Sequence, residues 1–292
     1  MAEFRAGFVA LLGPPNVGKS SLLNALLGQR LAIVSPRPQT TRSRILGIVP
    51  RTDAQILFLD TPGRHRGGKP LNTSLNAIVD EVARDCDVAL LLVDRSEGFS
   101  EVHDELAQAL AAAGRATVVV MTKSDLRPAR GPGARAVPAE LAEGALSVSA
   151  RKGAGLEPLL DAIVAKLPVS PRLYGEDELT DRPLRWICAE LIREAAIGLL
   201  GDELPHAVAV EIRDFDESSP PLTRIRANLL VERDSQKRIV VGQGGQKIKQ
   251  IGIRARQAIE GWVEGKVHLE LFVKVDPQWS KSGRRMTELG YH

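Results

Sequence analysis

Up to residue 167 the chain alternates between short apolar runs and longer segments in which apolar residues recur every three or four positions. The runs predict buried strands, and the periodic segments predict amphipathic helices. Strands are expected at 8–12, 43–49, 54–60, 87–94, 117–122 and 145–149, and helices at 19–27, 74–84, 101–113 and 156–167. This alternation predicts an α/β fold, a mostly parallel sheet with helices on both faces.

A different pattern follows the stretch LPVSPRLYGEDELTDRP at 167–183, which contains three prolines and a cluster of charges. After it we expect a smaller α+β domain with the order helix, strand, strand, helix, strand. Its helices are expected at 186–200 and 248–262, and its strands at 207–213, 223–233 and 267–275. The predicted domains therefore span residues 1–170 and 184–292, with a linker at 171–183.

Composition limits the classes of protein that fit this pattern. The chain has 292 residues, of which 43% are hydrophobic, and this is sufficient for one or two domains. No apolar run approaches the ~20 residues of a membrane span, and the short GFVALLG near the start predicts a strand and not a signal peptide. Cys86 and Cys188 lie inside apolar patterns, so we expect buried free thiols in a reducing cytosol.

Positive charge is concentrated in one segment, although the formal net charge of the whole chain is only +3. Between residues 233 and 256 seven basic residues stand against Asp234 alone, whereas residues 202–217 carry six acidic residues and one arginine. A concentrated positive field is what a polyanion site requires. The basic segment surrounds a run of glycines at 242–245, and another glycine loop lies near the N-terminus.

The N-terminal glycine loop fits the pattern G-x-x-x-x-G-K-[ST] and lies between a predicted strand and a predicted helix. In this pattern backbone N–H groups surround phosphates, the lysine reaches the outer phosphates, and the hydroxyl can ligate Mg²⁺. The residues expected to bind a nucleotide here are Gly13, Pro14, Pro15, Asn16, Val17, Gly18, Lys19, Ser20 and Ser21.

Three further strand ends carry residues that complete a nucleotide site. Asp60-Thr61-Pro62-Gly63 offers a carboxylate for Mg²⁺ and a glycine amide for the γ-phosphate, although a lone DTPG would predict only a turn. After the strand TVVVM, the Asp125 carboxylate can accept from guanine N1–H and the 2-amino group together, and adenine offers neither donor. The other residues expected at the base are Thr122, Lys123, Ser149, Ala150 and Arg151. Four such pieces in order predict a guanine nucleotide site.

These motifs resemble those of the translation-factor-like GTPases, and GPPNVGKS, the PQTTR at 38–42 and DTPGRH resemble the Era family. The resemblance implies that Thr41 is the switch-I threonine, with Thr40 as the alternative. Its hydroxyl would reach Mg²⁺ when the γ-phosphate is present. The Mg²⁺ ligands implied are Ser20, Thr41 and Asp60, and the catalytic residues implied are Lys19, Thr41 and Gly63.

Two residues depart from that pattern. Thr122 stands where asparagine is usual, so an amide that would contact the base and brace the phosphate loop is lost. Arg64 follows DTPG, where we expect a solvated switch residue and keep an internal cation for the transition state as the alternative. Without a water-orienting glutamine, turnover is expected to be on the order of 10⁻⁴–10⁻² s⁻¹. Asn16 stands where related GTPases ligate K⁺, which predicts hydrolysis stimulated by K⁺.

The second glycine loop lacks the Lys-Ser pair of a nucleotide loop and fits the G-x-x-G of a KH domain. In that module the loop holds the backbone of about four nucleotides, and groups beside it contact unpaired bases. A plain helix-start turn with a solvated basic face is the alternative. The residues expected to bind RNA are Arg238, Ile239, Val240, Gly242, Gln243, Gly244, Gly245, Lys247, Ile248 and Lys249. The order of elements around the loop resembles the type II arrangement.

A GTPase followed by a type II KH domain covers nearly the whole chain, as in the Era family. The resemblance implies a monomeric cytoplasmic GTPase, in part peripheral on the inner face of the cell membrane, that uses Mg²⁺ with GTP or GDP. It also implies binding to the 3′ end of 16S ribosomal RNA and assistance in small ribosomal subunit assembly and rRNA maturation. The residues alone predict a GTP switch coupled to single-stranded RNA. A GTP-dependent adaptor that docks a protein, and a P-loop kinase acting on an RNA end, are the rival interpretations.

Overall fold

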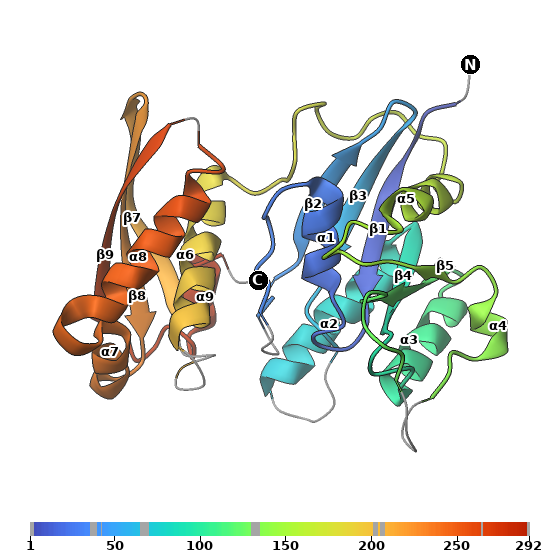
Figure 1. The fold of residues 1–292 in the computed structure, drawn as a ribbon, viewed down its shortest axis with the longest axis horizontal. Coiled ribbons are helices and arrows are strands. Elements are labelled where there is room, and N and C mark those ends of the chain that lie inside the picture. Colours follow the sequence, from blue (N-terminus) through green and yellow to red (C-terminus); the bar gives the residue numbers. More distant parts are fainter. Residues whose placement is uncertain are drawn as a thin grey trace. The chain divides into compact units, whose positions relative to one another are not determined.

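The computed structural model divides the chain into two compact units, one formed by Met1–Ala32 and Thr41–Asp181 and the other by Ile33–Thr40 and Arg182–His292 (Figure 1). The structure describes residues 3–35, 40–41, 43–64, 70–129, 135–200, 204, 208–263 and 265–290. Pro38, Gln39, Arg42 and His65, which carry part of the family resemblance, lie outside these ranges. Within them, no helix has both the length and the apolar character needed to cross a membrane.

A six-stranded sheet forms the core of the first unit, with the strand order β2-β3-β1-β4-β5-β6. Its strands are β1 (Arg5–Leu12), β2 (Ile45–Pro50), β3 (Ala54–Asp60), β4 (Val88–Asp94), β5 (Ala116–Thr122) and β6 (Leu146–Ser147). β2 pairs with β3 in the antiparallel sense, and the other pairs are parallel. The predicted α/β class is confirmed, and β6 is shorter than expected.

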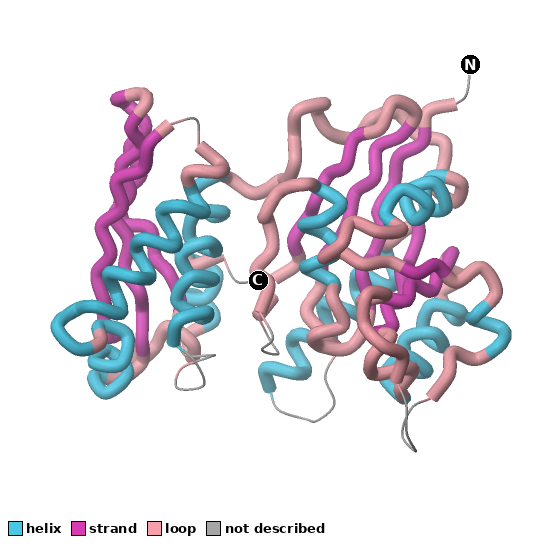
Figure 2. Tube along the Cα trace, in the orientation of Figure 1, coloured by secondary structure: helices cyan, strands magenta, loops and turns pink. Residues whose placement is uncertain are grey.

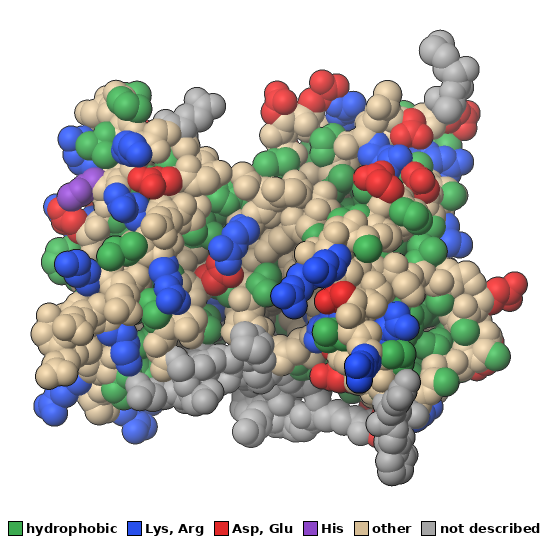
Figure 3. Space-filling model, viewed as in Figure 1, with side chains coloured by type: hydrophobic (Ala, Val, Ile, Leu, Met, Phe, Trp, Pro, Cys, Tyr) green, Lys and Arg blue, Asp and Glu red, His purple; other side chains and the backbone are tan. Residues whose placement is uncertain are grey.

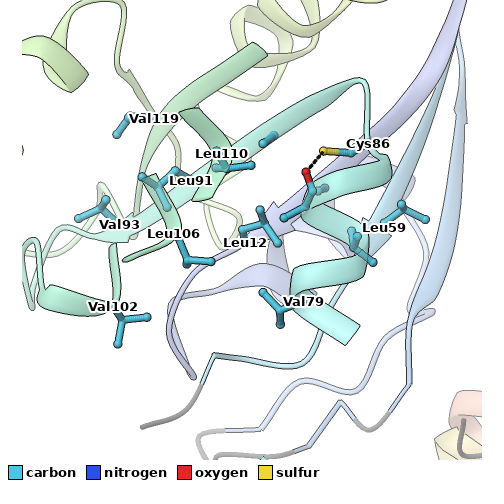
Figure 4. Packing of buried hydrophobic residues seen from close by; sticks show 14 of the residues in the cluster. Leu12, Leu59, Val79, Cys86, Leu91, Val93, Val102, Leu106, Leu110 and Val119 are labelled. Atoms are coloured by element: carbon cyan, nitrogen blue, oxygen red, sulfur yellow. Dashed lines mark hydrogen bonds between the residues drawn. The ribbon is translucent and has the colours of Figure 1, made fainter. Parts of the chain in front are cut away.

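Helices cover both faces of this sheet because its strands are apolar on both sides. α2 (Pro70–Asp85) and α3 (Glu101–Ala112) pack against alternate strand residues such as Leu12, Leu59 and Leu91 (Figure 4). α1 (Lys19–Leu27) lies on the opposite face, where a Cβ atom at Gly47 of β2 would be 2.6 Å from a methyl group of Leu23. The remaining helices of the described part of this unit are α4 (Ala139–Ala142), which sequence analysis misses, and α5 (Leu156–Val164).

The carboxyl ends of β1, β3, β4 and β5 lie at one edge of the sheet because these strands are parallel to one another. The strand register pairs Leu11 with Asp60 and Asp94 with Thr122. The loops that follow these strands therefore emerge side by side. This arrangement brings together motifs that are about a hundred residues apart in the sequence.

The second unit contains a three-stranded sheet with the order β7-β8-β9, in which β8 is antiparallel to β7 and parallel to β9. Its elements are α6 (Leu184–Leu200), β7 (Ala209–Ser219), β8 (Leu222–Val231), α7 (Asp234–Val241), α8 (Gln246–Ile259), β9 (Lys266–Val275) and α9 (Gly283–Glu288). α6 and α8 lie against one face of the sheet (Figure 2). The other face is covered in part by Trp279 and Leu289, which contact Ala209 and Leu230.

The sequence pattern does not predict α7, which separates β8 from the second glycine loop. Its last residues, Ile239-Val240-Val241, are β-branched and favour a strand by propensity. The helix forms because the Gln236 side chain accepts from the backbone N–H groups of Glu232 and Arg233, at 2.8 and 3.0 Å. This cap satisfies donors that the start of a helix leaves without partners.

Candidate nucleotide and nucleic-acid sites

The phosphate loop follows β1 and ends where α1 begins at Lys19. Its backbone has positive φ angles at Gly13 (151°), Asn16 (61°) and Gly18 (106°). A Cβ atom at Gly13 would lie 2.9 Å from the Leu92 carbonyl oxygen, so glycine is required there. The loop leads directly into the N-terminus of a helix at the edge of the sheet, an arrangement that binds phosphate.

Lys19 is buried within this loop, with 6% of its surface exposed. Its Nζ donates to the carbonyl oxygens of Gly13 and Pro14, at 3.1 and 2.8 Å. Burial lowers the pKa of Lys19 to about 8, and the charge of Asp60 opposes this shift. A phosphate bound at the loop would supply a second negative charge beside this ammonium and stabilise its protonated form.

Ser20, Thr41 and Asp60, the expected Mg²⁺ ligands, lie together. Ser20 Oγ donates to Asp60 Oδ2 at 2.7 Å and lies 3.2 Å from Thr41 Oγ1. Asp60 Oδ1 is buried and has no hydrogen-bond partner among the described residues. Burial raises the pKa of Asp60 to about 6, against the hydrogen bond from Ser20 and the charge of Lys19, which lower it. Two hydroxyls beside a carboxylate oxygen without a partner suit a hard cation such as Mg²⁺.

The loop after β3 packs directly on the phosphate loop. A Cβ atom at Gly63 would lie 2.6 Å from Pro15 Cα, so a side chain there would push the two loops apart. The side chain of the next residue, Arg64, is 19% exposed and forms ion pairs with Asp80 of α2 and Glu105 of α3. The expectation of a solvated Arg64 is therefore wrong, because two carboxylates hold its guanidinium.

A pocket of about 230 Å³ lies between the start of α1 and the loops that follow β5 and β6. It is lined by Gly18, Ser21, Leu22, Thr122, Lys123, Asp125, Leu126, Val148, Ala150 and Arg151. Ser149 Oγ donates to Asp125 Oδ1 at 2.6 Å, and this hydrogen bond lowers the pKa of Asp125. The carboxylate is therefore ionised at neutral pH and can accept two donors from guanine. The residues expected at the base thus lie around one pocket.

Thr122 braces the phosphate loop from β5. Its Oγ1 donates to the Val17 carbonyl oxygen at 2.6 Å and lies 3.3 Å from the Val93 carbonyl oxygen. The expected loss of this brace is wrong, because the threonine hydroxyl reaches the loop without the longer asparagine amide. The shorter side chain still offers no amide to the edge of a base.

Two polar residues behind the site are not among those predicted from the sequence. Asp94 ends β4, and its Oδ2 lies 2.5 Å from Lys123 Nζ. A carboxylate at the end of a predicted strand is the sequence signal that could have identified this residue. His103 of α3 donates from Nε2 to the Leu92 carbonyl oxygen at 2.9 Å and accepts at Nδ1 from Ser100 N at 3.0 Å. These partners require the neutral ring with its proton on Nε2. No sequence signal marks His103, because Leu92 lies on a different element.

The second glycine loop is open. Gly242 has φ 71°, and a Cβ atom there would lie 2.6 Å from Lys247 Cβ, so glycine is required at this position. Gly244 and Gly245 have φ angles of 56° and 78°, yet a Cβ atom on either would meet no described atom within 4 Å. α8 begins directly after the loop. An extended phosphate backbone can therefore reach the loop without displacing a side chain.

A groove of about 320 Å³ lies between α8 and β9. It is lined by Ile248, Lys249, Gly252, Ile253, Arg256, Leu269 and Leu271. Lysine, arginine and apolar side chains gather on this face of the unit (Figure 3). Of the expected RNA-binding residues, Ile248 and Lys249 line the groove, and Arg238 is exposed on α7. Val240 is 0% exposed and belongs to the core, so the expectation that it contacts RNA is wrong.

Two family models match the two units. One, described as a 50S ribosome-binding GTPase, matches residues 8–123, and the other, described as a KH domain, matches residues 203–280. The fold and the sites therefore define a P-loop GTPase that carries a KH domain. The chain is 43% identical to GTPase Era of Mycobacterium tuberculosis over 100% of both chains, and 41% identical to GTPase Era of Nostoc sp. over 99% of this chain and 90% of the relative. The chain belongs to the GTPase Era family.

Two solved structures of Era share this fold. One is Era in complex with MgGDPNP and nucleotides 1506–1542 of 16S ribosomal RNA, with 36% sequence identity and a TM-score of 0.87. The other is a variant of Aquifex aeolicus Era bound to GDP and aluminium fluoride, with 36% identity and a TM-score of 0.88. Each comparison covers 99% of this chain and 99% of the other, so the similarity includes both units.

Proposed function

We propose that the first unit binds GTP with Mg²⁺ and hydrolyses it slowly to GDP and phosphate. The observation that carries this proposal is the buried Asp60 oxygen without a partner, next to the hydroxyls of Ser20 and Thr41. The name shared by the relatives and the MgGDPNP in one Era structure support it. We propose that residues 1–170 form the GTPase domain, that 171–183 form a linker and that 184–292 form the RNA-binding domain.

The chain's own residues would act in hydrolysis by position and charge. Lys19 and the N–H groups of the phosphate loop would hold the outer phosphates, and the Gly63 amide would face the γ-phosphate. Ser20, Thr41 and Asp60 would hold Mg²⁺, which neutralises phosphate charge when bound. Arg64 offers no charge to the transition state while Asp80 and Glu105 hold it. Slow turnover, on the order of 10⁻⁴–10⁻² s⁻¹, follows.

We also propose that K⁺ stimulates the reaction through Asn16. This residue has φ 61°, an uncommon angle for a side-chain-bearing residue, and it is exposed within the phosphate loop. Hydrolysis rates in KCl and in NaCl at the same ionic strength test the proposal. Equal rates in the two salts would contradict it.

We infer that the second unit binds single-stranded RNA through the open glycine loop and the groove between α8 and β9. Open glycines admit the phosphate backbone, and Lys249 and Arg256 supply charge beside apolar side chains that can contact bases. The similarity to Era bound to nucleotides 1506–1542 of 16S ribosomal RNA supports the 3′ end of that RNA as the ligand. We extend the proposal to small ribosomal subunit assembly by a cytoplasmic monomer, with a fraction peripheral on the membrane.

The RNA proposal is tested by Gly244→Asp with Gly244→Asn as its matched control. Position 244 is open and has φ 56°, which aspartate and asparagine both tolerate, so the two variants differ in charge alone. Binding to an oligonucleotide of the 16S 3′ end is expected to weaken at least about tenfold for Gly244→Asp and little for Gly244→Asn. Wild-type binding by both variants would favour an adaptor that docks a protein.

A product assay separates the GTPase from a P-loop kinase. A GTPase releases free phosphate, whereas a kinase would produce phosphorylated RNA.

A further inference from the structure

The turn that follows β4, residues 94–96, is hydrogen-bonded to the loop 122–125 that begins at the end of β5. Arg95 donates from its backbone N–H to the Thr122 carbonyl oxygen at 3.1 Å. Its side chain donates from Nη1 to the Ser124 carbonyl oxygen, also at 3.1 Å. One residue of the turn thus holds two backbone carbonyls of the loop that carries the proposed base-reading carboxylate.

Asp94, which precedes Arg95, holds a side chain of the same loop. Asp94 is 2% exposed, and its Oδ1 accepts from the backbone N–H and the hydroxyl of Ser96, at 2.8 and 2.6 Å. Its Oδ2 lies 2.5 Å from Lys123 Nζ, in an ion pair. Because two hydrogen bonds fix one carboxylate oxygen, the other offers the ammonium a fixed position. The stem of Lys123, which lines the base pocket, is therefore held at its far end.

The backbone of Lys123 has φ 53°, in the left-handed region, which is unfavourable for a residue with a side chain. Such a conformation persists only where its surroundings hold it. The turn that it makes is closed by the Leu126 N–H, which donates to the Lys123 carbonyl oxygen at 2.8 Å. Asp125 lies inside this turn and accepts from Ser149 Oγ at 2.6 Å. The direction of the Asp125 carboxylate therefore depends on the contacts that hold Lys123.

We propose that Asp94 and Arg95 are positioning residues for guanine recognition, which hold the loop 122–125 so that the Asp125 carboxylate faces the base. This inference rests on the proposed binding of a guanine nucleotide by the first unit. The described lining of the base pocket contains neither Asp94 nor Arg95, so both act through the loop. A carboxylate that accepts from N1–H and the 2-amino group together must be placed more accurately than one that accepts from N1–H alone. Inosine diphosphate (IDP) lacks the 2-amino group, so the preference for GDP over IDP reports the position of this carboxylate.

Asp94→Asn in the full-length chain is the first test. Asparagine has the size of aspartate and keeps an acceptor for Ser96, but it offers no charge to Lys123. We expect GDP affinity to fall at least about tenfold and the preference for GDP over IDP to fall at least about threefold. Competition of each nucleotide with a fluorescent guanine nucleotide measures both. Asp161→Asn is the control, because it makes the same change at a side chain that is 67% exposed, and it should keep the wild-type values.

Arg95→Met is the second variant and decides the question if Asp94→Asn does not fold. Arg95 is half-buried, and methionine keeps most of its apolar stem and its backbone N–H while it removes the donor to Ser124. A smaller loss of the preference for GDP over IDP is expected, and Arg95→Lys, which keeps a donor, should restore part of it. Arg84→Met, at an exposed arginine of α2, is the matched control and should leave the preference unchanged.

A wild-type preference for GDP over IDP in Arg95→Met, and in Asp94→Asn if that variant folds, would overturn the proposal. Equal losses of affinity for GDP and IDP would also overturn it, because they would indicate a structural role without an effect on the carboxylate. Equal affinities of the wild type for GDP and ADP would instead refute the guanine site of the proposed function.

Discussion

The two glycine loops of this chain differ in how much of the molecule surrounds them. The phosphate loop is enclosed: Thr122 bonds to Val17, Gly63 packs on Pro15, and Lys19 is 6% exposed. The loop before α8 is open, and neither Gly244 nor Gly245 has a described neighbour where a side chain would begin. Both loops use glycine, and both lead into a helix, yet their surroundings are opposite.

The degree of enclosure affects how each loop can select its ligand. An enclosed site leaves polar groups without partners when the wrong ligand binds, which supports strong discrimination between similar molecules. An open loop places charge along a phosphate backbone, which favours affinity and makes binding depend on salt. We therefore expect changes at the first loop to alter selectivity, and changes at the second to alter affinity and its salt dependence.

Asp125→Asn should produce the largest effect. The variant replaces an ionised acceptor, which Ser149 holds at 2.6 Å, with an amide that repels one guanine donor. The preference for GDP over ADP should fall by roughly 10³- to 10⁴-fold, measured by competition with a fluorescent guanine nucleotide. RNA affinity of the same variant should stay unchanged. An unaltered preference for GDP would remove Asp125 from the base site.

Thr122→Val removes the hydroxyl that braces the phosphate loop. Valine has the shape of threonine but leaves the Val17 carbonyl oxygen buried and without its 2.6 Å donor. A loss of about 1–3 kcal/mol, or roughly five- to 150-fold in GDP affinity, should follow. Thr122→Ser keeps the hydroxyl and serves as the control. If the valine and serine variants bind GDP equally well, the hydroxyl does not brace the loop.

Lys249→Met tests whether the positive charge of Lys249, beside the open glycine loop, contributes to RNA binding. Lys249 is exposed and lines the groove beside α8. Each phosphate contact that is removed should reduce the slope of log affinity against log salt by about 0.7, with only a severalfold loss of RNA affinity at fixed salt. Lys281→Met, an exposed lysine outside the groove, should leave the slope unchanged. GDP affinity should not respond to either substitution.

His103→Gln should have the smallest effect of these substitutions, and the size of that effect should depend on pH. Burial lowers the pKa of His103, despite its hydrogen bonds and Asp104, which raise it, while Lys19 lowers it further. A lowered pKa means that the neutral ring stabilises the folded state above pH ~6.5 and that this contribution is lost as the pH falls through the lowered value. Glutamine keeps a donor for the Leu92 carbonyl oxygen and does not titrate.

The free energies of unfolding of the wild type and of His103→Gln should therefore differ more at pH 5 than at pH 7.5, with the variant less sensitive to acid. Urea unfolding at both pH values measures this difference, and comparing the two proteins cancels the titration of the groups that they share. Parallel pH profiles would show that the ring does not titrate behind the loop.

Much of the fold and of the nucleotide site could be predicted from the sequence because their signals are local. The apolar runs of β1, β3, β4 and β5 give the parallel sheet, and the motifs that end these strands must meet at one edge. α7 escaped prediction because a cap from Gln236 outweighs the strand propensity of its β-branched residues. The prediction of a solvated Arg64 is wrong because its partners Asp80 and Glu105 come from two helices later in the chain.

Residue types and their spacing are enough to predict a P-loop, a base-reading carboxylate and a second glycine loop in a basic segment. How these groups are braced depends on the folded chain, since the Thr122 side chain bonds to Val17 across 105 positions of sequence and the Arg193 side chain bonds to Thr40 across 153. Periodicity and motif spacing are properties of neighbouring residues. A hydrogen bond between distant residues depends on the packing of every element between them.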